Sequence, residues 1–414
     1  MGMKLNRGRQ AVFRKKNTWL RSLLWVVTAL AVVALGFFGA KLLDKPPVTD
    51  DPDSSAVSAP DQTLDTSGSG TLPSEPAQPT VTEPTAPSTI RAFYLPVSVL
   101  RDTARLSATL EQAKAAGFNS VVFDLKDSAG QLHYRFSCQP AQQVNSYTAD
   151  AFTAEELAQL FTTLREAGLQ PIPRLYAFRD NLGAKALPSA RITPQGNSGW
   201  TWYDDNPNSG GKAWLNPYAD EAHSYIIQLA QELQAAGATA ILLDGVQFPE
   251  QTSSASYGNS SNTALARDEV LALFVDKVKL ALDDCTVILS CTAQGALGTD
   301  TAVYGGNPLT FAPTAAAPTI LPGSLPATIR IGETVITNSP DTLQQTVQTL
   351  VGQMVLRTKV MAADKQPTLL PWLQAEGYSA AQIRQEIDGC VAGGVEQFIL
   401  YSPTGSYNFA GLKG

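Results

Sequence analysis

The sequence predicts an α/β protein whose folded part is a (β/α)8 TIM barrel, preceded by one transmembrane helix and a disordered linker. Two observations predict the barrel. Short apolar segments alternate with amphipathic helical stretches, and one junction of helix end, glycine and apolar strand recurs, as AAGFNSVVFDLKD, EAGLQPIPRLYAF, AAGATAILLDG and AGGVEQFILYS. Such junctions are typical of parallel strands joined by helices, and about eight strands in a domain of this length favour a barrel over an open sheet.

The expected strands are short and rich in Val, Ile, Leu and Phe, as strands buried on both faces should be. They span residues 91–95, 120–125, 171–178, 239–244, 286–290, 319–321, 368–374 and 397–401. Amphipathic helices are expected between most of them, at 103–116, 154–167, 219–236, 264–282, 341–358 and 380–392. Several of these helices stop at a glycine that suits the left-handed position after a helix, namely Gly117, Gly168, Gly237 and Gly393.

The first 88 residues read as three segments that do not belong to the barrel. Residues 1–21 form a basic tail, and residues 22–40 carry no charge and are almost wholly apolar. We therefore expect a signal anchor at 22–43 with its N-terminus in the cytoplasm; a cleaved signal peptide is the alternative. Residues 44–88 are rich in Pro, Ser and Thr and predict a disordered linker, so that the barrel at 89–414 would be extracytoplasmic.

The composition excludes several classes of function. Charged residues make up 16% of the chain and the formal net charge is −7, without the basic surface that nucleic-acid binding needs. The four cysteines, Cys138, Cys285, Cys291 and Cys390, have no C-x-x-C spacing, which predicts buried free thiols instead of a zinc site. Of the two histidines, His223 falls within a predicted helix, where a surface role is expected. We expect no metal and no cofactor.

Polar side chains follow the ends of several predicted strands. In a parallel barrel these ends converge on one mouth, which is where barrel enzymes have their active sites. The candidate catalytic residues are Asp244, Glu376, Glu250 and Asp127, and the candidate substrate-binding residues are Asp124, Lys126, Arg174, Tyr176, Gln247, Trp372, Gln374 and Tyr401. Several carboxylates around one mouth suit glycoside cleavage, in which one acid protonates the leaving oxygen and another attacks or activates water.

Some of these residues also have structural interpretations. Asp124 and Lys126 would share a face if the strand is regular, so that Asp124 could simply pair with Lys126 or Arg174. Glu250 and Glu376 could be solvated loop acids. Two insertions, 180–215 and 294–318, would lie at the rim; the first carries the aromatic run 200–203, either a sugar platform or a small packed core.

The chain resembles a known bacterial family, the "putative glycosyl hydrolase domain" that was formerly a domain of unknown function. The resemblance covers residues 90–412 and lies in IRAFYLPV, FNSVVFDLKDSAGQLHY, PIPRLYAFRD, KAWLNPYADEAHSYIIQLAQELQAAGATAILLDGVQFP and LLPWLQAEGYSAAQIRQEIDGCVAGGVEQFILYSPTGSY. It implies a TIM barrel that hydrolyses a cell-envelope or environmental polysaccharide, and it implies site residues at Asp124, Asp127, Asp244, Trp372 and Gln374.

The chain departs from this family in two places. Gly245 stands where the family usually has tyrosine and Gln247 where it has arginine, and residues 319–326 lack the family's tyrosine and histidine. Two hypotheses follow. The chain is a membrane-anchored glycoside hydrolase with Asp244 as nucleophile or base, Trp372 as a sugar platform and a polysaccharide as partner, or it is a noncatalytic carbohydrate-binding or scaffold barrel.

Overall fold

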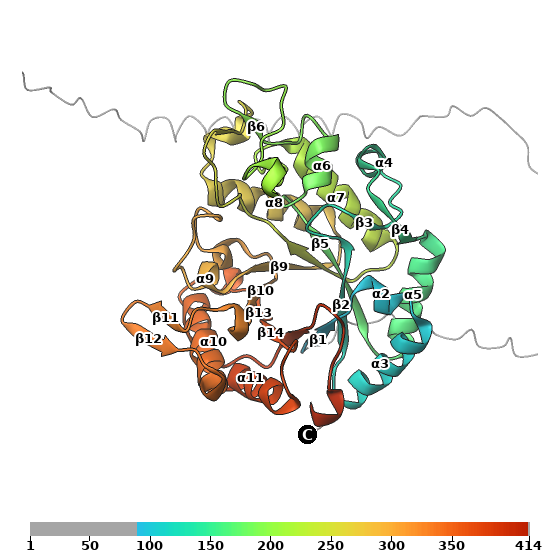
Figure 1. The fold of residues 1–414 in the computed structure, drawn as a ribbon, viewed down its shortest axis with the longest axis vertical. Helices are drawn as coiled ribbons and strands as arrows, with labels where there is room; N and C mark the ends of the chain where they lie inside the picture. The colour runs from blue at the N-terminus through green and yellow to red at the C-terminus, as the bar shows by residue number, and fades with distance from the viewer. Residues whose placement is uncertain (1–88, 413–414) are drawn as a thin grey trace, which may run out of the picture. The chain divides into compact units, whose positions relative to one another are not determined.

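The computed structural model describes residues 89–412, which form the predicted barrel. Eight parallel strands pair in the order β1–β2–β5–β7–β9–β10–β14–β15, and β15 pairs with β1, which closes the ring (Figure 1). The strands are β1 (Arg91–Tyr94), β2 (Ser120–Lys126), β5 (Gln170–Tyr176), β7 (Ala240–Asp244), β9 (Thr286–Thr292), β10 (Ala315–Thr319), β14 (Trp372–Gln374) and β15 (Phe398–Tyr401). This confirms the predicted (β/α)8 architecture.

Amphipathic helices connect the strands, as the helical periodicity predicts. The long ones are α3 (Thr103–Ala115), α5 (Ala154–Glu166), α7 (Asp220–Ala235), α8 (Arg267–Ala281), α10 (Leu343–Lys359) and α11 (Ala380–Ala392). Shorter elements are α2 (Val97–Leu100), α4 (Gln139–Val144), α6 (Asn181–Ala186), α9 (Ala293–Ala296), β3 (Leu132–Tyr134), β4 (Tyr147–Phe152), β6 (Thr193–Pro194), β8 (Ala255–Ser256), β11 (Thr328–Ile331), β12 (Thr334–Thr337) and β13 (Thr368–Leu369). Loops at the carboxyl ends of the strands therefore carry most of the additional structure.

Alternation along the strands separates two cores. On β1, Ala92 and Tyr94 point into the barrel, whereas Phe93 joins the larger core between strands and helices. The same period of two places Val122 of β2 and Ile172 of β5 inside. Because inward positions recur at every second residue, the last inward residue of each strand faces the mouth.

The sixth and seventh strands differ from the prediction. The sixth strand is β10 at Ala315–Thr319, not 319–321, because its small residues give no apolar signal although they fit the crowded barrel interior. The seventh is split into β13 and β14 around Pro371. The last helix ends at Ala392, as predicted, but the left-handed residue after it is Gly394, with a φ of 97°, and not Gly393.

The described residues give no information on the N-terminal segments. Within residues 89–412 no helix is long and apolar enough to cross a membrane. The predicted tail at 1–21, anchor at 22–43 and linker at 44–88 lie outside the described residues. They stay predictions.

The four cysteines are free thiols, as predicted, although only two of them are fully buried. Cys291 and Cys390 are buried, whereas Cys138 and Cys285 are partly exposed. Burial raises the pKa of the Cys138 thiol to about 11, so this thiol is protonated at neutral pH. Among residues 89–412 no cluster of His, Cys, Asp and Glu could hold a metal ion.

The expectation of a surface role for His223 is wrong. His223 lies in the first turn of α7 and is 1% exposed. Its ring packs against the rings of Phe178 and Phe274. Its Nε2 lies 2.7 Å from the Pro217 carbonyl oxygen, and Lys277 Nζ lies 3.4 Å from its Nδ1. The helical position could not reveal this burial, which comes from packing against α8. Burial, helped by the charge of Lys277, lowers the pKa of His223 to about 4.

This lowered pKa predicts a loss of stability in acid. His223 takes up a proton near pH 6.5 in the unfolded chain but only near pH 4 in the folded chain. Between these pH values the unfolded chain binds more protons, so the contribution of neutral His223 to the unfolding free energy is complete above pH 6.5 and is lost as the pH falls to 4. We expect the loss to be roughly 3 kcal/mol. Urea unfolding at pH 7 and pH 4 should show a decrease in unfolding free energy that is smaller in His223→Gln by that amount. Equal decreases in both proteins would contradict this assignment.

Candidate active site at the barrel mouth

Arg174 is the centre of the barrel mouth. It is an inward residue of β5, and its side chain is only 8% exposed. Its Nε and one terminal nitrogen donate to the two oxygens of Asp124 on β2, the second bond at 3.0 Å, and its other terminal nitrogen lies 3.4 Å from Asp244 Oδ2 on β7. Burial alone would lower the pKa of Arg174, but Asp124 and the other negative groups raise it overall. One cation therefore joins two carboxylates from the neighbouring strands.

Aromatic rings surround this guanidinium. Its central carbon lies 5.0 Å from the ring centres of Tyr94 and Tyr176 and 5.2 Å from that of Trp372. Tyr401 contacts both Tyr94 and Trp372 edge-on or tilted. Tyr94 was not among the predicted site residues, yet its hydroxyl donates to Asp124 Oδ2 at 3.0 Å. Its place as the last inward residue of β1 was the available signal.

The tryptophan is not placed as the expected sugar platform. Trp372 is 3% exposed, and the guanidinium of Arg174 lies over its ring, so neither ring face is open for stacking. Its indole Nε1 is buried without a hydrogen-bond partner among the described residues. Trp372 therefore contributes an apolar wall and one unused N–H donor to the mouth.

Asp244 is the more accessible of the two carboxylates on Arg174. Its side chain is 21% exposed, compared with 12% for Asp124. One oxygen faces Arg174, and the other accepts a hydrogen bond from the backbone N–H of Gly245 at 2.7 Å. Gly245 has a φ of 61°, a conformation that glycine adopts without strain, and this turn brings its N–H back to the carboxylate. Asp124, by contrast, is fully engaged by Arg174 and Tyr94.

Lys126, a predicted substrate-binding residue, does not face the mouth, because β2 is not regular at this point and the condition for sharing a face with Asp124 is not met. The register between β2 and β5 shifts between Asp124 and Lys126, which is the signature of a bulge. The shift turns Lys126 to the outer face of the barrel, where it pairs with Asp180 at 2.9 Å and is fully buried. Within residues 89–412, its ion pair is with Asp180 and not with a carboxylate of the mouth.

Asp127 belongs to the turn that follows β2. Its Oδ1 accepts from the backbone N–H groups of Ala129 and Gln131, both at 2.9 Å, and its Oδ2 lies 3.6 Å from His133 Nε2. Burial would raise the pKa of Asp127, but these hydrogen bonds lower it overall. The arrangement favours the ionised carboxylate, which suits a turn and not a proton donor.

Glu376 follows β14 and lies at the exposed edge of the mouth. The hydroxyls of Ser402 and Thr404 donate to its Oε2 at 2.6 and 3.1 Å. Burial raises the pKa of the Tyr401 phenol, and the charges of Asp124, Asp244 and Glu376 raise it further. Glu376 therefore lies beside the residues that follow Tyr401, and Ser402 and Thr404 are contacts that the prediction missed.

A second group of polar residues lies at the rim, between the insertion after β5 and the loop after β7. A pocket there is lined by Arg179, Asp204, Asp205, Ser209, Gly210, Gly211, Lys212, Trp214, Gln247, Glu250 and Gln251. Glu250 is exposed, and Gln247 accepts a long hydrogen bond from Tyr304 at 3.5 Å. Asp204 is committed to the fold of the insertion, because it accepts from the Lys212 backbone and the Trp214 indole.

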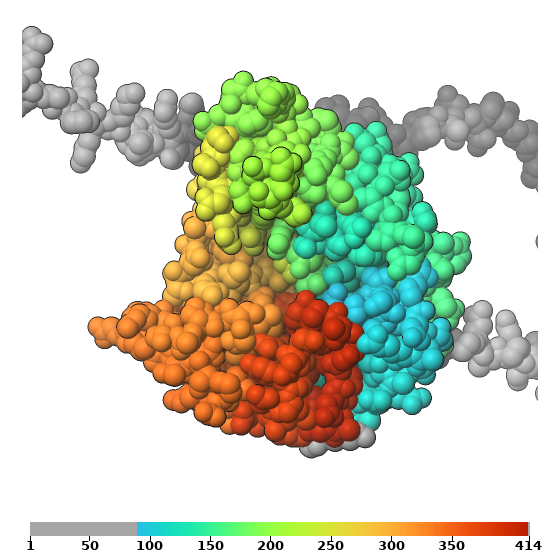
Figure 2. Space-filling model, viewed as in Figure 1, coloured from blue at the N-terminus to red at the C-terminus, as the bar shows by residue number. Residues whose placement is uncertain are grey.

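The insertion itself is a small packed lobe (Figure 2, green). Trp202 and Trp214 are buried with Ile192 and Ala255, and β6 of the insertion pairs with β8 of the loop after β7. Of the three tryptophans in this insertion, only Trp200 is exposed to solvent, at 69%. The aromatic run was predicted to be either a sugar platform or a small packed core, and Trp202 belongs to a packed core.

Gln374 shapes the loop after β14. Its side chain accepts from the Gly323 backbone N–H at 2.9 Å and donates to the Glu376 carbonyl at 3.0 Å. Its own backbone N–H donates to Glu386, a fully buried carboxyl of α11, at 2.7 Å. Burial raises the pKa of Glu386 well above its ordinary range. Gln374 thus connects the segment 319–326, which departs from the family pattern, to the loop that carries Glu376.

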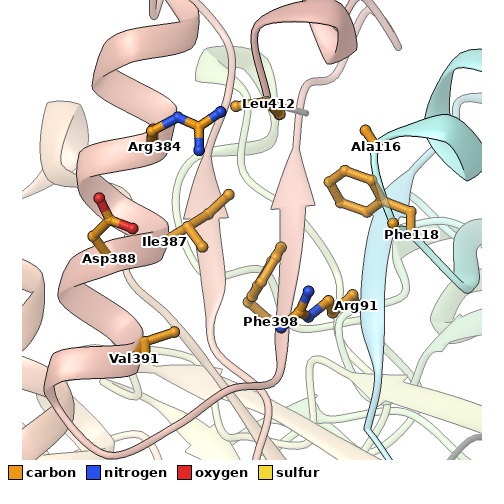
Figure 3. A pocket seen from close by; sticks show the side chains of 10 residues that line it. Arg91, Ala116, Phe118, Arg384, Ile387, Asp388, Val391, Phe398 and Leu412 are labelled. Atoms are coloured by element: carbon orange, nitrogen blue, oxygen red, sulfur yellow. The ribbon is translucent and has the colours of Figure 1, made fainter. Parts of the chain in front are cut away.

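A different pocket lies at the opposite end of the barrel. Figure 3 shows it between α11 and the starts of β1 and β15, lined among others by Arg91, Phe118, Asp388 and Phe398. Parallel strands place their starts away from the mouth, so this pocket does not contain the carboxylates joined by Arg174.

The following three solved structures are among those similar to this chain. Among solved structures, a hypothetical protein from Ruminiclostridium thermocellum has 21% identity and a TM-score of 0.42, covering 48% of this chain and 96% of that one. The glycoside hydrolase domain of PelA from Pseudomonas aeruginosa has 12% identity and a TM-score of 0.41, covering 78% and 97%. The catalytic domain of β-amylase from Paenibacillus polymyxa has 11% identity and a TM-score of 0.49, covering 78% and 94%. No curated protein matches the chain.

A family model identifies the domain more directly. The model described as "Putative glycosyl hydrolase domain" matches residues 92–407, which includes every strand of the barrel except the first residue of β1. The match agrees with the resemblance found in the sequence motifs. The chain therefore belongs to the family of this glycosyl hydrolase domain.

Proposed function

We propose that the chain is a membrane-anchored, extracytoplasmic glycoside hydrolase that acts on a cell-envelope or extracellular polysaccharide. The observation that supports it most is the pair of carboxylates, Asp124 and Asp244, held by different nitrogens of the buried Arg174 guanidinium at the mouth. Glycoside hydrolysis needs carboxylates that flank the scissile bond, and a cation beside them keeps a nucleophile or base ionised. The anchor at 22–43 is proposed from its apolar sequence alone.

Asp244 is the proposed nucleophile or base. It is the more exposed carboxylate of the pair, and the Gly245 N–H and Arg174 orient it. Asp124 is the proposed partner that fixes Arg174, because both of its oxygens already accept hydrogen bonds. In this arrangement Arg174 contributes from β5 the positive charge that the family usually has at the position of Gln247.

Glu376 is the proposed general acid. It is exposed, only one of its oxygens accepts hydroxyl hydrogen bonds, and its charge acts on Tyr401 together with that of Asp244. Glu250 is the alternative acid, since it lines the rim pocket beside Gln247. Asp127 is the weakest candidate because the turn after β2 uses its carboxylate.

The rim pocket is a proposed site for further sugar residues of the substrate. Among the described residues, no hydrogen bond or ion pair engages the side chains of Arg179 or Glu250, so both can bind hydroxyl groups. Trp214, the tryptophan that lines this pocket, is buried in the lobe core. Recognition there would rest on polar contacts and not on stacking over this indole.

A noncatalytic carbohydrate-binding barrel is the second candidate function. The observations that favour it are the replacements at Gly245 and Gln247 and the missing tyrosine and histidine in residues 319–326, which change two walls of the mouth. The buried ring of Trp372 also offers no open face to a sugar. Binding without turnover would be the behaviour expected of such a protein.

Replacing Asp244 with asparagine tests the catalytic proposal. The amide keeps the shape and the contact with Gly245 but cannot act as nucleophile or base, so we expect turnover to fall about 10³-fold. Release of reducing ends from purified cell-wall and extracellular polysaccharides by the full chain measures it. Asp388→Asn, at the opposite end of the barrel, is the matched control and should keep full turnover. Unchanged turnover in Asp244→Asn would remove Asp244 from its role, and binding without any turnover in the native protein would favour the second candidate.

Replacing Arg174 with methionine tests the ion cluster. Two carboxylates would then stay in the mouth without their cation, and we expect the unfolding free energy to fall by roughly 3–5 kcal/mol. Urea unfolding measures this change. Arg174→Met combined with Asp124→Leu removes the buried partner as well and should recover a large part of the loss. If the single variant is as stable as the native protein, the cluster does not hold the mouth together.

A further inference from the structure

A fully buried ion pair lies directly behind the mouth, on the outer face of the barrel. Lys126 Nζ is 2.9 Å from Asp180 Oδ2, and both side chains are 0% exposed. The same ammonium donates to the carbonyl oxygen of Tyr176 at 2.6 Å and faces the ring of Tyr225 on α7. Burying a salt bridge costs solvation that the attraction often does not repay, so stability alone is a weak reason for this pair.

The surroundings of Asp180 are built to receive its carboxylate. Asp180 Oδ1 accepts from the Gly183 N–H at 2.6 Å and so caps the start of α6. A Cβ at Gly130 would lie 1.8 Å from Asp180 Oδ1, and one at Gly183 would lie 2.4 Å from Asp180 Oδ2. Only glycine leaves room at these two positions. The pair therefore ties together the turn after β2, the end of β5 and the start of α6.

The carbonyl that Lys126 holds belongs to the backbone segment that also holds Asp244. The next residue, Ala177, donates its N–H to the Asp244 carbonyl at 2.7 Å, and Phe178 donates to the Gly245 carbonyl at 3.1 Å. The Tyr176 ring contacts Arg174 on the inner side. The segment 176–178 is thus fixed on one side by Lys126 and on the other by the backbone of Asp244 and Gly245.

We propose that Lys126 is a positioning residue for the mouth: through the Tyr176 carbonyl it fixes the segment 176–178, and through that segment the place of Asp244 beside Arg174. Lys126 does not touch the reacting atoms in this proposal. An effect of Lys126 on turnover rests on the proposed function, whereas its effect on the position of the segment 176–178 does not.

The double variant Lys126→Met with Asp180→Asn tests this role in the full chain. Both charges disappear together, the asparagine can still cap α6, and the Tyr176 carbonyl loses its donor. Lys126→Met alone would leave Asp180 buried without a cation, and we expect its Tm to fall by roughly 10 °C, whereas the double variant should recover most of that fall. Amide hydrogen exchange at Ala177 and Phe178 is the main readout. It should be at least about 10-fold faster in the double variant, with exchange in β9 and β10 unchanged.

The matched control is Arg101→Met with Glu156→Gln, which removes a surface ion pair and should leave exchange at Ala177 and Phe178 as in the native protein. If the double variant does not fold, Lys126→Arg replaces it: the guanidinium can still pair with Asp180 but cannot occupy the place of the ammonium, so exchange at the same two amides should rise.

Native protection of Ala177 and Phe178 in the folded variant would overturn the proposal. Faster exchange together with a native chain that turns over no glycan would overturn the proposed function and leave the positioning role standing. Where turnover is present, kcat should fall at least about 10-fold in the double variant with KM less affected.

Discussion

The barrel mouth depends on one buried guanidinium between two carboxylates. Asp124 and Asp244 end apolar strands, where a carboxylate without a partner is costly, and Arg174 offers its nitrogens to both. The rings of Tyr94, Tyr176 and Trp372 exclude water from the guanidinium and so strengthen its attraction to the acids. The position of each charge is therefore fixed by the other two, and the mouth behaves as one unit.

The unit is supported from outside the barrel as well as from inside. A regular β2 would have pointed Lys126 into the mouth, adding a second cation beside Asp124. The bulge instead moves that charge behind the strands, where Asp180 neutralises it. The mouth then keeps two carboxylates on one shared cation, and Asp244 stays partly open to solvent.

Local signals in the sequence were enough for most of the fold, and interactions between distant segments account for what was missed. Apolar runs and glycine junctions are local, so seven of the eight strands were placed close to their true positions. β10 was displaced because AAAPT carries no apolar signal until the barrel surrounds it. The inward residues Asp124, Arg174, Tyr176 and Asp244 follow from a period of two. Lys126 does not, because the direction of its side chain depends on Asp180, which is distant in sequence, and His223 is buried by contacts with α8 that no helical pattern contains.

The departures from the family pattern are best understood through backbone geometry. Gly245 turns with a φ of 61°, and a Cβ there would lie 3.3 Å from Tyr176 and 3.2 Å from Arg179 Cβ, so a larger residue would need a different turn. With glycine, the turn returns its own N–H to Asp244 and leaves space beside Tyr176. The loss of an arginine at Gln247 then does not leave Asp244 without a cation, because Arg174 reaches it from the neighbouring strand. Glycine at position 245 therefore sets how the carboxylate is oriented and what fits beside it, and Arg174 keeps one cation next to that carboxylate.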